Sequence, residues 1–239
     1  MSSGKVQKRL MKLKGVFWQG YSWLALRHSP LNRRSLARRI ENLAVDKLHV
    51  GCGDVLLSGW LNILFEQRQE YGRVKNIQGT WLLNFNLHKP WPVGDERMSV
   101  IAGSHFIEHL DLNAGLRFAR EAFRVLKTGG VLRLSCPDLE LYARRYVEKN
   151  SAFFQHPLIR EWCTFKAAAT PGEIFIAKAY DSGGAHKWFY DFESLRHVLI
   201  NAGFREVNRV GRKEGKTPDL DKLEPAAREL ETLYVEAVK

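Results

Sequence analysis

The chain has 239 residues, 45% of them hydrophobic, which is enough to bury the core of one domain with an extension. No stretch approaches the roughly 20 apolar residues that a membrane-spanning helix needs. Its three cysteines, Cys52, Cys136 and Cys163, lie far apart without CxxC spacing. This argues against a disulfide framework or a zinc knuckle and favours a reducing, cytoplasmic compartment.

The net charge of +11 is concentrated near the N-terminus. Residues 1–45 contain ten Lys or Arg and one acidic residue, whereas the other 194 residues contain 27 basic and 25 acidic side chains. Within this segment, GVFWQGYSWLAL (15–26) interleaves aromatic and polar residues. The composition favours a helix packed on the domain or one lying on an anionic membrane surface, with RNA binding as a third alternative. We therefore predict a basic, aromatic helical extension over 1–45, and a protein that is at most peripheral to the inner face of the membrane.

From residue 46 onward, patterns typical of strands and helices alternate. Strands are predicted at KLHVG, GWLNILF, MSVIAGS (98–104), Val131–Ser135, GFREVNRVG and TLYVEAVK, the last with the alternation of an edge strand. Helices are predicted over 114–126, closed by the glycines of Lys127-Thr128-Gly129-Gly130 as a C-cap, and over 191–202. The order predicts an α/β fold, a mostly parallel sheet with helices on both faces and a final antiparallel strand pair.

Ligands of such sheets bind beyond the carboxyl ends of the strands, where the strand order reverses. The segments expected there are 51–54, 63–66, 86–88, 104–109 and 135–138. Gly51 and Gly53 follow the first strand and lack a Cβ, so the backbone can turn sharply and lie close to a ligand. The third glycine of the dinucleotide pattern GxGxxG is replaced by Leu56, which disfavours NAD. A plain turn between two strands is the alternative.

Several segments together are more informative than the glycines. VGCG, GWLN, LNFNLHKPWP, SHFIEHL, VLKTGG and a terminal LYVEAVK follow one another over about 190 residues. This order resembles the class I S-adenosylmethionine-dependent methyltransferases, and looks most like a subgroup associated with surface-glycan or lipid-linked sugar pathways. The resemblance implies a seven-stranded Rossmann-like fold over residues 46–239 that binds S-adenosyl-L-methionine.

The resemblance also implies cofactor contacts, residue by residue. The turn of Gly51, Cys52 and Gly53, with Val50 before it, would run under the methionine part of the cofactor. The remaining expected contacts are Ser104, Glu66, Asn86 and Leu87. The family usually has an acid where this chain has Leu64, so Glu66 would replace it as the ribose ligand, and an Asp where this chain has Asn86. An amide oxygen can still accept a bond from the adenine amino group.

His105 is the predicted general base, because its unperturbed pKa lies near neutrality and it follows a strand at the predicted site. The alternative is that His105 packs against the cofactor. His105, Glu108, His109 and His186 could together line a metal site, but a hard cation prefers oxygen ligands. We predict no metal.

Residues 139–190 are too long for an ordinary crossover and form a predicted insertion on the substrate side. Its aromatic and arginine side chains suit a sugar or a lipid-linked sugar, although they suit core packing equally well. We predict acceptor contacts at His186 and Tyr190, and a hinge at Gly183-Gly184.

The sequence therefore predicts methyl transfer from S-adenosylmethionine to a hydroxyl of a small, glycan or lipid-linked acceptor. Two alternatives stay open. One is a catalytically inactive relative that acts as a partner protein at a membrane. The other is a nucleic-acid methyltransferase, which is disfavoured because no RNA-binding module is recognisable.

Overall fold

The computed structural model describes residues 33–65, 71–180 and 185–239, which form two compact units. The sheet unit contains the described residues up to Tyr142 and those from Trp188 onward, and the helical unit contains those of 143–187. Residues 1–32 of the predicted extension, which include the aromatic stretch at 15–26, lie outside the described residues, as do Glu66 and the Gly183-Gly184 hinge. Within the described ranges, no helix is both long and apolar enough to cross a membrane.

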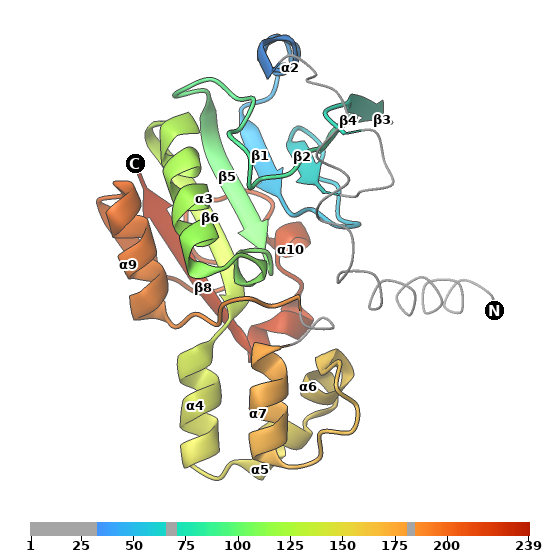
Figure 1. Cartoon of the computed structure of the whole chain (residues 1–239), viewed down its shortest axis with the longest axis vertical. Coiled ribbons are helices and arrows are strands. Elements are labelled where there is room, and N and C mark those ends of the chain that lie inside the picture. The colour runs from blue at the N-terminus through green and yellow to red at the C-terminus, as the bar shows by residue number, and fades with distance from the viewer. Residues whose placement is uncertain (1–32, 66–70, 181–184) are drawn as a thin grey trace, which may run out of the picture. The chain divides into compact units, whose positions relative to one another are not determined.

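The sheet has the order β3-β4-β2-β1-β5-β6-β8-β7 (Figure 1). Neighbours from β4 to β6 are parallel, whereas β3 pairs antiparallel with β4, and β8 pairs antiparallel with both β6 and β7. The strands are β1 (Lys47–Val50), β2 (Leu61–Leu64), β3 (Val74–Ile77), β4 (Thr80–Asn84), β5 (Met98–Ser104), β6 (Leu126–Pro137), β7 (Glu206–Arg209) and β8 (Thr232–Val238). The predicted α/β class with a C-terminal antiparallel pair is confirmed, and the described sheet has one strand, β3, beyond the seven expected.

Several predicted elements coincide with the observed ones. Strands β1 and β5 have the predicted positions. Helix α9 (Phe192–Ala202) begins after Asp191, whose side chain accepts a hydrogen bond from the Ser194 amide, and ends at Gly203, whose φ of 115° is left-handed. The helix agrees with the predicted range of 191–202, and both of its ends are set by local caps.

The predicted glycine C-cap of the helix at 114–126 is wrong. Helix α3 (Leu112–Val125) ends at Leu126, which has an extended backbone, and residues 127–130 already belong to β6. Their backbone groups bond the end of β8, with the Gly129 amide donating to Lys239 and the Lys239 amide donating to Gly130. The glycine segment therefore pairs within the sheet and does not cap the helix.

The prediction of TLYVEAVK as an edge strand is also wrong. Strand β8 lies between β6 and β7, and six of its seven residues are buried. Glu236 explains the polar pattern, because its carboxylate accepts hydrogen bonds from the Lys216 and Thr217 amides and lies 3.8 Å from the Arg133 guanidinium. The Glu236 carboxylate can be buried because it is paired in this way.

The β3–β4 hairpin was not predicted. Gln78 and Gly79 form its turn with φ angles of 49° and 83°, as a two-residue hairpin turn requires. The Asn76 side chain accepts a hydrogen bond from the Gly79 amide at 2.9 Å. This hairpin ends the sheet on the side of β4.

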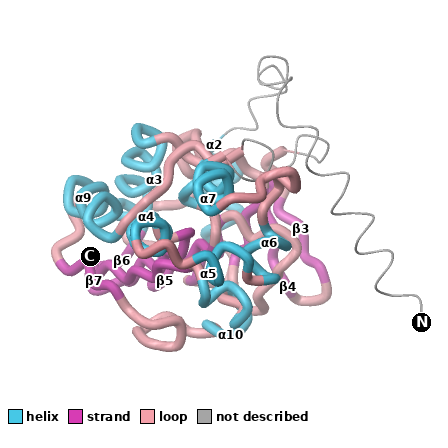
Figure 2. Tube along the Cα trace, turned by 90° about the horizontal axis from the view of Figure 1, so that it is seen from below, coloured by secondary structure: helices cyan, strands magenta, loops and turns pink. Residues whose placement is uncertain are grey.

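Helices cover the two faces of the sheet unequally. Helices α3 and α9 lie side by side on one face, and the short α10 (Leu220–Leu223) lies on the other (Figure 2). Helix α2 (Arg33–Glu41) buries Leu36 and Ile40 in the same core as α3 and α9, so the sheet unit includes residues N-terminal to 46. The face opposite α3 is filled by a smaller cluster of Leu57, Trp60, Val100, Ala102 and Leu223.

Two of the described crossovers between parallel strands contain no helix. Residues 51–60 join β1 to β2, and residues 85–97 join β4 to β5, both as turns and loops. A parallel crossover usually contains a helix. The first connection is the one that carries the glycine pair.

The helical unit contains α5 (Ser151–Gln155), α6 (Pro157–Trp162), α7 (Pro171–Ala179) and the end of α4 (Leu139–Val147). A capping box of Thr170 and Glu173 starts α7, and the Tyr146 ring packs on Phe175 with a centroid distance of 5.9 Å. Two further short helices, η2 (Ile107–His109) and η3 (Ala226–Leu230), belong to the sheet unit.

A buried ion pair fixes the segment between β7 and β8. The Arg133 guanidinium binds both oxygens of Glu224, at 2.8 and 2.7 Å, and both side chains are almost fully buried. We expect Arg133→Met to destabilise the protein by about 3–5 kcal/mol, because it leaves a buried carboxylate without its partner. Urea unfolding measures this, and Lys213→Met, which breaks an exposed pair with Asp221, should leave the midpoint unchanged. An Arg133→Met protein as stable as the wild type would contradict the assignment.

Candidate functional site

The order of the strands reverses between β1 and β5. From β1 the chain proceeds outward through β2 to β4, then returns to the other side of β1 with β5. A ligand crevice is expected at such a point, outside the carboxyl ends of the two strands. Gly51 follows β1 there, and His105 follows β5.

The glycine turn has a left-handed backbone at two positions. Gly51 and Gly53 have φ angles of 65° and 52°, and the Cys52 amide donates to the Ile63 carbonyl at 3.0 Å. A Cβ added to Gly51 would lie 2.5 Å from the Phe106 ring, whereas one added to Gly53 would meet nothing within 4 Å. Gly51 therefore admits Phe106, and Gly53 leaves open space in front of the backbone. Val50, which precedes the turn, is fully buried.

The cysteines near this edge are not nucleophiles. Cys52 is buried, and burial raises the pKa of its thiol to about 12. Burial likewise raises the pKa of Cys136 well above its ordinary value. Both are therefore neutral thiols near pH 7, which disfavours covalent catalysis of the kind that some nucleic-acid methylases use.

The segment after β4 reaches the same edge through aromatic packing. The Leu87 carbonyl accepts a hydrogen bond from the Trp91 indole at 3.2 Å. Trp91 and Phe106 each pack against Phe118 with centroid distances of 5.3 Å. Leu87 is thus linked to Phe106, and through it to Gly51.

Asn86 and Ser104 are already engaged. The Asn86 side-chain oxygen accepts a hydrogen bond from the His88 amide at 2.9 Å, so one of its two lone pairs remains for a ligand. The Ser104 hydroxyl accepts from the Ser135 hydroxyl at 3.1 Å, which joins β5 to β6 at their carboxyl ends.

His105 lies between two protein partners. Its Nε2 is 3.0 Å from the Thr232 hydroxyl, and its Nδ1 is 3.3 Å from a carboxylate oxygen of Glu108. The backbone of His105 has a φ of 49°, a left-handed value that non-glycine residues adopt rarely. Both ring nitrogens are therefore oriented by the protein.

The hydrogen-bond directions determine where the protons lie. The Thr232 hydroxyl donates to the Arg228 carbonyl at 2.6 Å, so it must accept from His105 Nε2–H. A general base must accept a proton at a ring nitrogen that is open to the acceptor, so His105 could act as one only if one of its two contacts were to break.

The two predicted acceptor residues lie in different surroundings. Tyr190 belongs to the sheet unit, is fully buried, and has its hydroxyl 2.6 Å from the position of a Cβ added to Gly115 of α3. Burial raises the pKa of this hydroxyl, and in this structure Tyr190 is a core residue. His186 belongs to the helical unit, where its Nδ1 lies 3.0 Å from the Lys178 carbonyl oxygen.

Phe106 and Thr232 were not predicted from the sequence. Phe106 stands within the quoted SHFIEHL segment, but Gly51, which it faces, lies far from it along the chain. Thr232 is 127 residues from His105, so no sequence spacing could indicate their contact.

No protein-family model matches the chain, and neither does any curated protein. Among solved structures, the chain is similar to a SAM-dependent methyltransferase from Thermotoga maritima, with 17% identity, a TM-score of 0.46, and coverage of 90% of this chain and 92% of that one. It is also similar to one from Archaeoglobus fulgidus, with 13% identity, a TM-score of 0.45, and coverage of 87% and 92%. The activities in these names are those of the two proteins.

The protonation of His105 can be tested by NMR. We expect long-range proton–nitrogen spectra at neutral pH to show His105 with a proton on Nε2, because Thr232 can only accept from it. Thr232→Val should change the His105 signals, whereas Thr232→Ser keeps the hydroxyl and should preserve them. A neutral ring protonated on Nδ1 alone would show that the deduced direction is wrong.

Proposed function

We propose that the protein transfers a methyl group from S-adenosylmethionine. The observation that carries the proposal is the left-handed glycine turn at the reversal of strand order, followed by a connection without a helix. A dinucleotide would place its pyrophosphate on the N-terminus of a helix after this turn. Residues 51–60 contain no helix, and S-adenosylmethionine has no phosphate to bind.

The residues at the edge fit parts of this cofactor. The open space at Gly53 allows close backbone approach, and Asn86 retains a lone pair for a ligand amino group. The cofactor would supply an electrophilic methyl group, and methyl transfer is a displacement whose rate depends on alignment of the two reactants. The protein therefore acts by holding the methyl donor and the acceptor in line. His105, fixed by Glu108 and Thr232, would shape the acceptor side.

The acceptor is proposed to be a hydroxyl of a small, glycan or lipid-linked molecule, with residues 139–190 contributing to its site. The glycan assignment rests on the sequence resemblance described above. His186 stays a candidate acceptor contact in that segment.

A titration with S-adenosylmethionine tests the cofactor assignment. We expect the wild type to bind it in calorimetry, and Gly53→Asn to bind at least about tenfold more weakly, because the new side chain fills the open space. Asparagine tolerates a left-handed backbone, so stability should change little. Gly79→Asn, at the left-handed turn of the distant β3–β4 hairpin, is the matched control. A wild type that gives neither heat nor a thermal shift overturns the proposal and favours an inactive relative.

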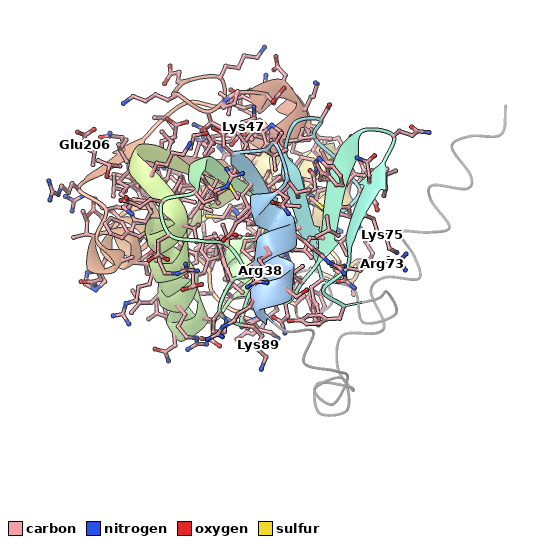
Figure 3. The ribbon with its side chains drawn as sticks, turned by 90° about the horizontal axis from the view of Figure 1, so that it is seen from above. Arg38, Lys47, Arg73, Lys75, Lys89 and Glu206 are labelled. Atoms are coloured by element: carbon pink, nitrogen blue, oxygen red, sulfur yellow. The ribbon has the colours of Figure 1, made fainter. Side chains whose placement is uncertain are left out.

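An anionic membrane surface is the proposed partner of residues 1–45. The described sheet unit also carries basic side chains: Arg38 lies on α2, Lys75 on β3, and Arg73 just before β3 (Figure 3). Each basic residue near an anionic surface contributes about 1 kcal/mol to the binding free energy.

We expect the full chain to co-sediment with vesicles containing phosphatidylserine. Replacing the six Lys and Arg of residues 1–32 by Gln should reduce binding, and equal binding by both proteins contradicts this role.

A further inference from the structure

We infer that Asn62 is the positioning residue of the cofactor loop, and that its side-chain amide substitutes for the missing helix between β1 and β2. The inference rests on the proposed binding of S-adenosylmethionine at Gly51–Gly53. It adds a residue outside the turn that sets the conformation of residues 51–60.

Asn62 lies in β2 and is fully buried. Its oxygen accepts a hydrogen bond from the Leu57 amide at 2.9 Å, and its nitrogen donates to the Leu57 and Trp81 carbonyls, both at 3.0 Å. A backbone N–H can only donate and a carbonyl can only accept. The orientation of the amide is therefore fixed by its partners. One side chain thus holds the loop at Leu57 and joins it to β4.

The same amide also reaches β1. Asn62 stands opposite His49 in the β1–β2 register, and its oxygen is 3.1 Å from His49 Nδ1. Because an amide oxygen can only accept hydrogen bonds, His49 must donate from Nδ1. A neutral imidazole meets that need, and burial lowers the pKa of His49. Asn62 therefore connects β1, β4 and the loop between β1 and β2.

Trp60 is the second anchor of the loop. Its indole donates to the Asp219 carboxylate at 2.9 Å, and its fully buried ring packs edge-on against His49 at a centroid distance of 6.4 Å. Asp219 stands at the start of α10, in the segment that the Arg133–Glu224 pair fixes. The loop is thus held from the sheet by Asn62 and from the β7–β8 connection by Asp219.

The loop is exposed on both sides of the Leu57 anchor. The Cys52 amide is bound to Ile63, and Leu57 and Trp60 are bound as described, whereas residues 53–55 and 58–59 are exposed. Of these two exposed parts, residues 53–55 begin within the left-handed turn of Gly51 and Gly53, at the strand-order reversal. Asn62 therefore holds residues 53–55 in position for the cofactor, and its own side chain makes no contact with the cofactor.

The first experiment compares affinity with stability. Asn62→Asp keeps the shape but replaces the donor by a second acceptor that faces the carbonyls of Leu57, Trp60 and Trp81, and Asn62→Leu removes both functions. We expect both to weaken S-adenosylmethionine binding about tenfold or more and to accelerate hydrogen exchange at Leu57. Val198→Ala, in α9 on the opposite face, controls for general loss of stability and should keep wild-type affinity.

The second experiment uses the Trp60–Asp219 anchor. Asp219 has a left-handed φ of 60°, which both Asn and Gly tolerate. Asp219→Asn keeps an acceptor for the indole and should bind like the wild type. Asp219→Gly and Trp60→Phe lose the hydrogen bond and should each lose affinity while remaining folded.

The outcomes separate the two proposals. A wild type that binds no cofactor overturns the proposed function and this inference with it. If the wild type binds and Asn62→Leu binds equally well, the inference alone is overturned. The same holds if Val198→Ala loses as much affinity as Asn62→Leu.

Discussion

Buried peptide groups must have hydrogen-bond partners, and the connection between β1 and β2 satisfies this requirement without a helix. A helix bonds its own backbone, whereas an irregular loop needs partners from elsewhere. Asn62 supplies them, because an amide side chain carries both a donor and an acceptor and can bond both backbone groups of Leu57. The glycine turn, the smaller core cluster and the segment before α10 all meet around this loop.

The carboxyl edge of the sheet is completed by a strand that runs the other way. Since β8 is antiparallel to β6, its first residue, Thr232, pairs with Pro137 at the end of β6. That position brings the Thr232 hydroxyl to His105, which follows β5. The C-terminal strand pair therefore contributes a hydrogen-bonding group to an edge that is otherwise built from the ends of parallel strands.

Much of the sheet could be predicted because its signals are local. The apolar runs of β1 and β5 and the caps of α9 lie within a few residues of the elements they define. The α/β class then follows from the order of these elements along the chain.

The two wrong assignments have a common physical cause, which is pairing at long range. Glu236 made β8 resemble an edge strand, but its carboxylate accepts hydrogen bonds from backbone amides 19 and 20 residues away and is therefore buried. The glycines after α3 indicated a cap, but they bond to Lys239. In the candidate site, the glycine turn was visible in the sequence, whereas the partners of His105 and Asn62 were set by the register of distant strands.

The position of β8 has a consequence for how the chain assembles. Among the described strands, β7 pairs with β8 alone. During synthesis β7 therefore emerges from the ribosome before the strand that attaches it to the sheet. The antiparallel end of the sheet closes only when residues 232–238 are available, and contacts of such long sequence separation form slowly. Until then the edge of β6 that pairs with β8 is open, and unpaired strand edges make a folding chain prone to aggregation.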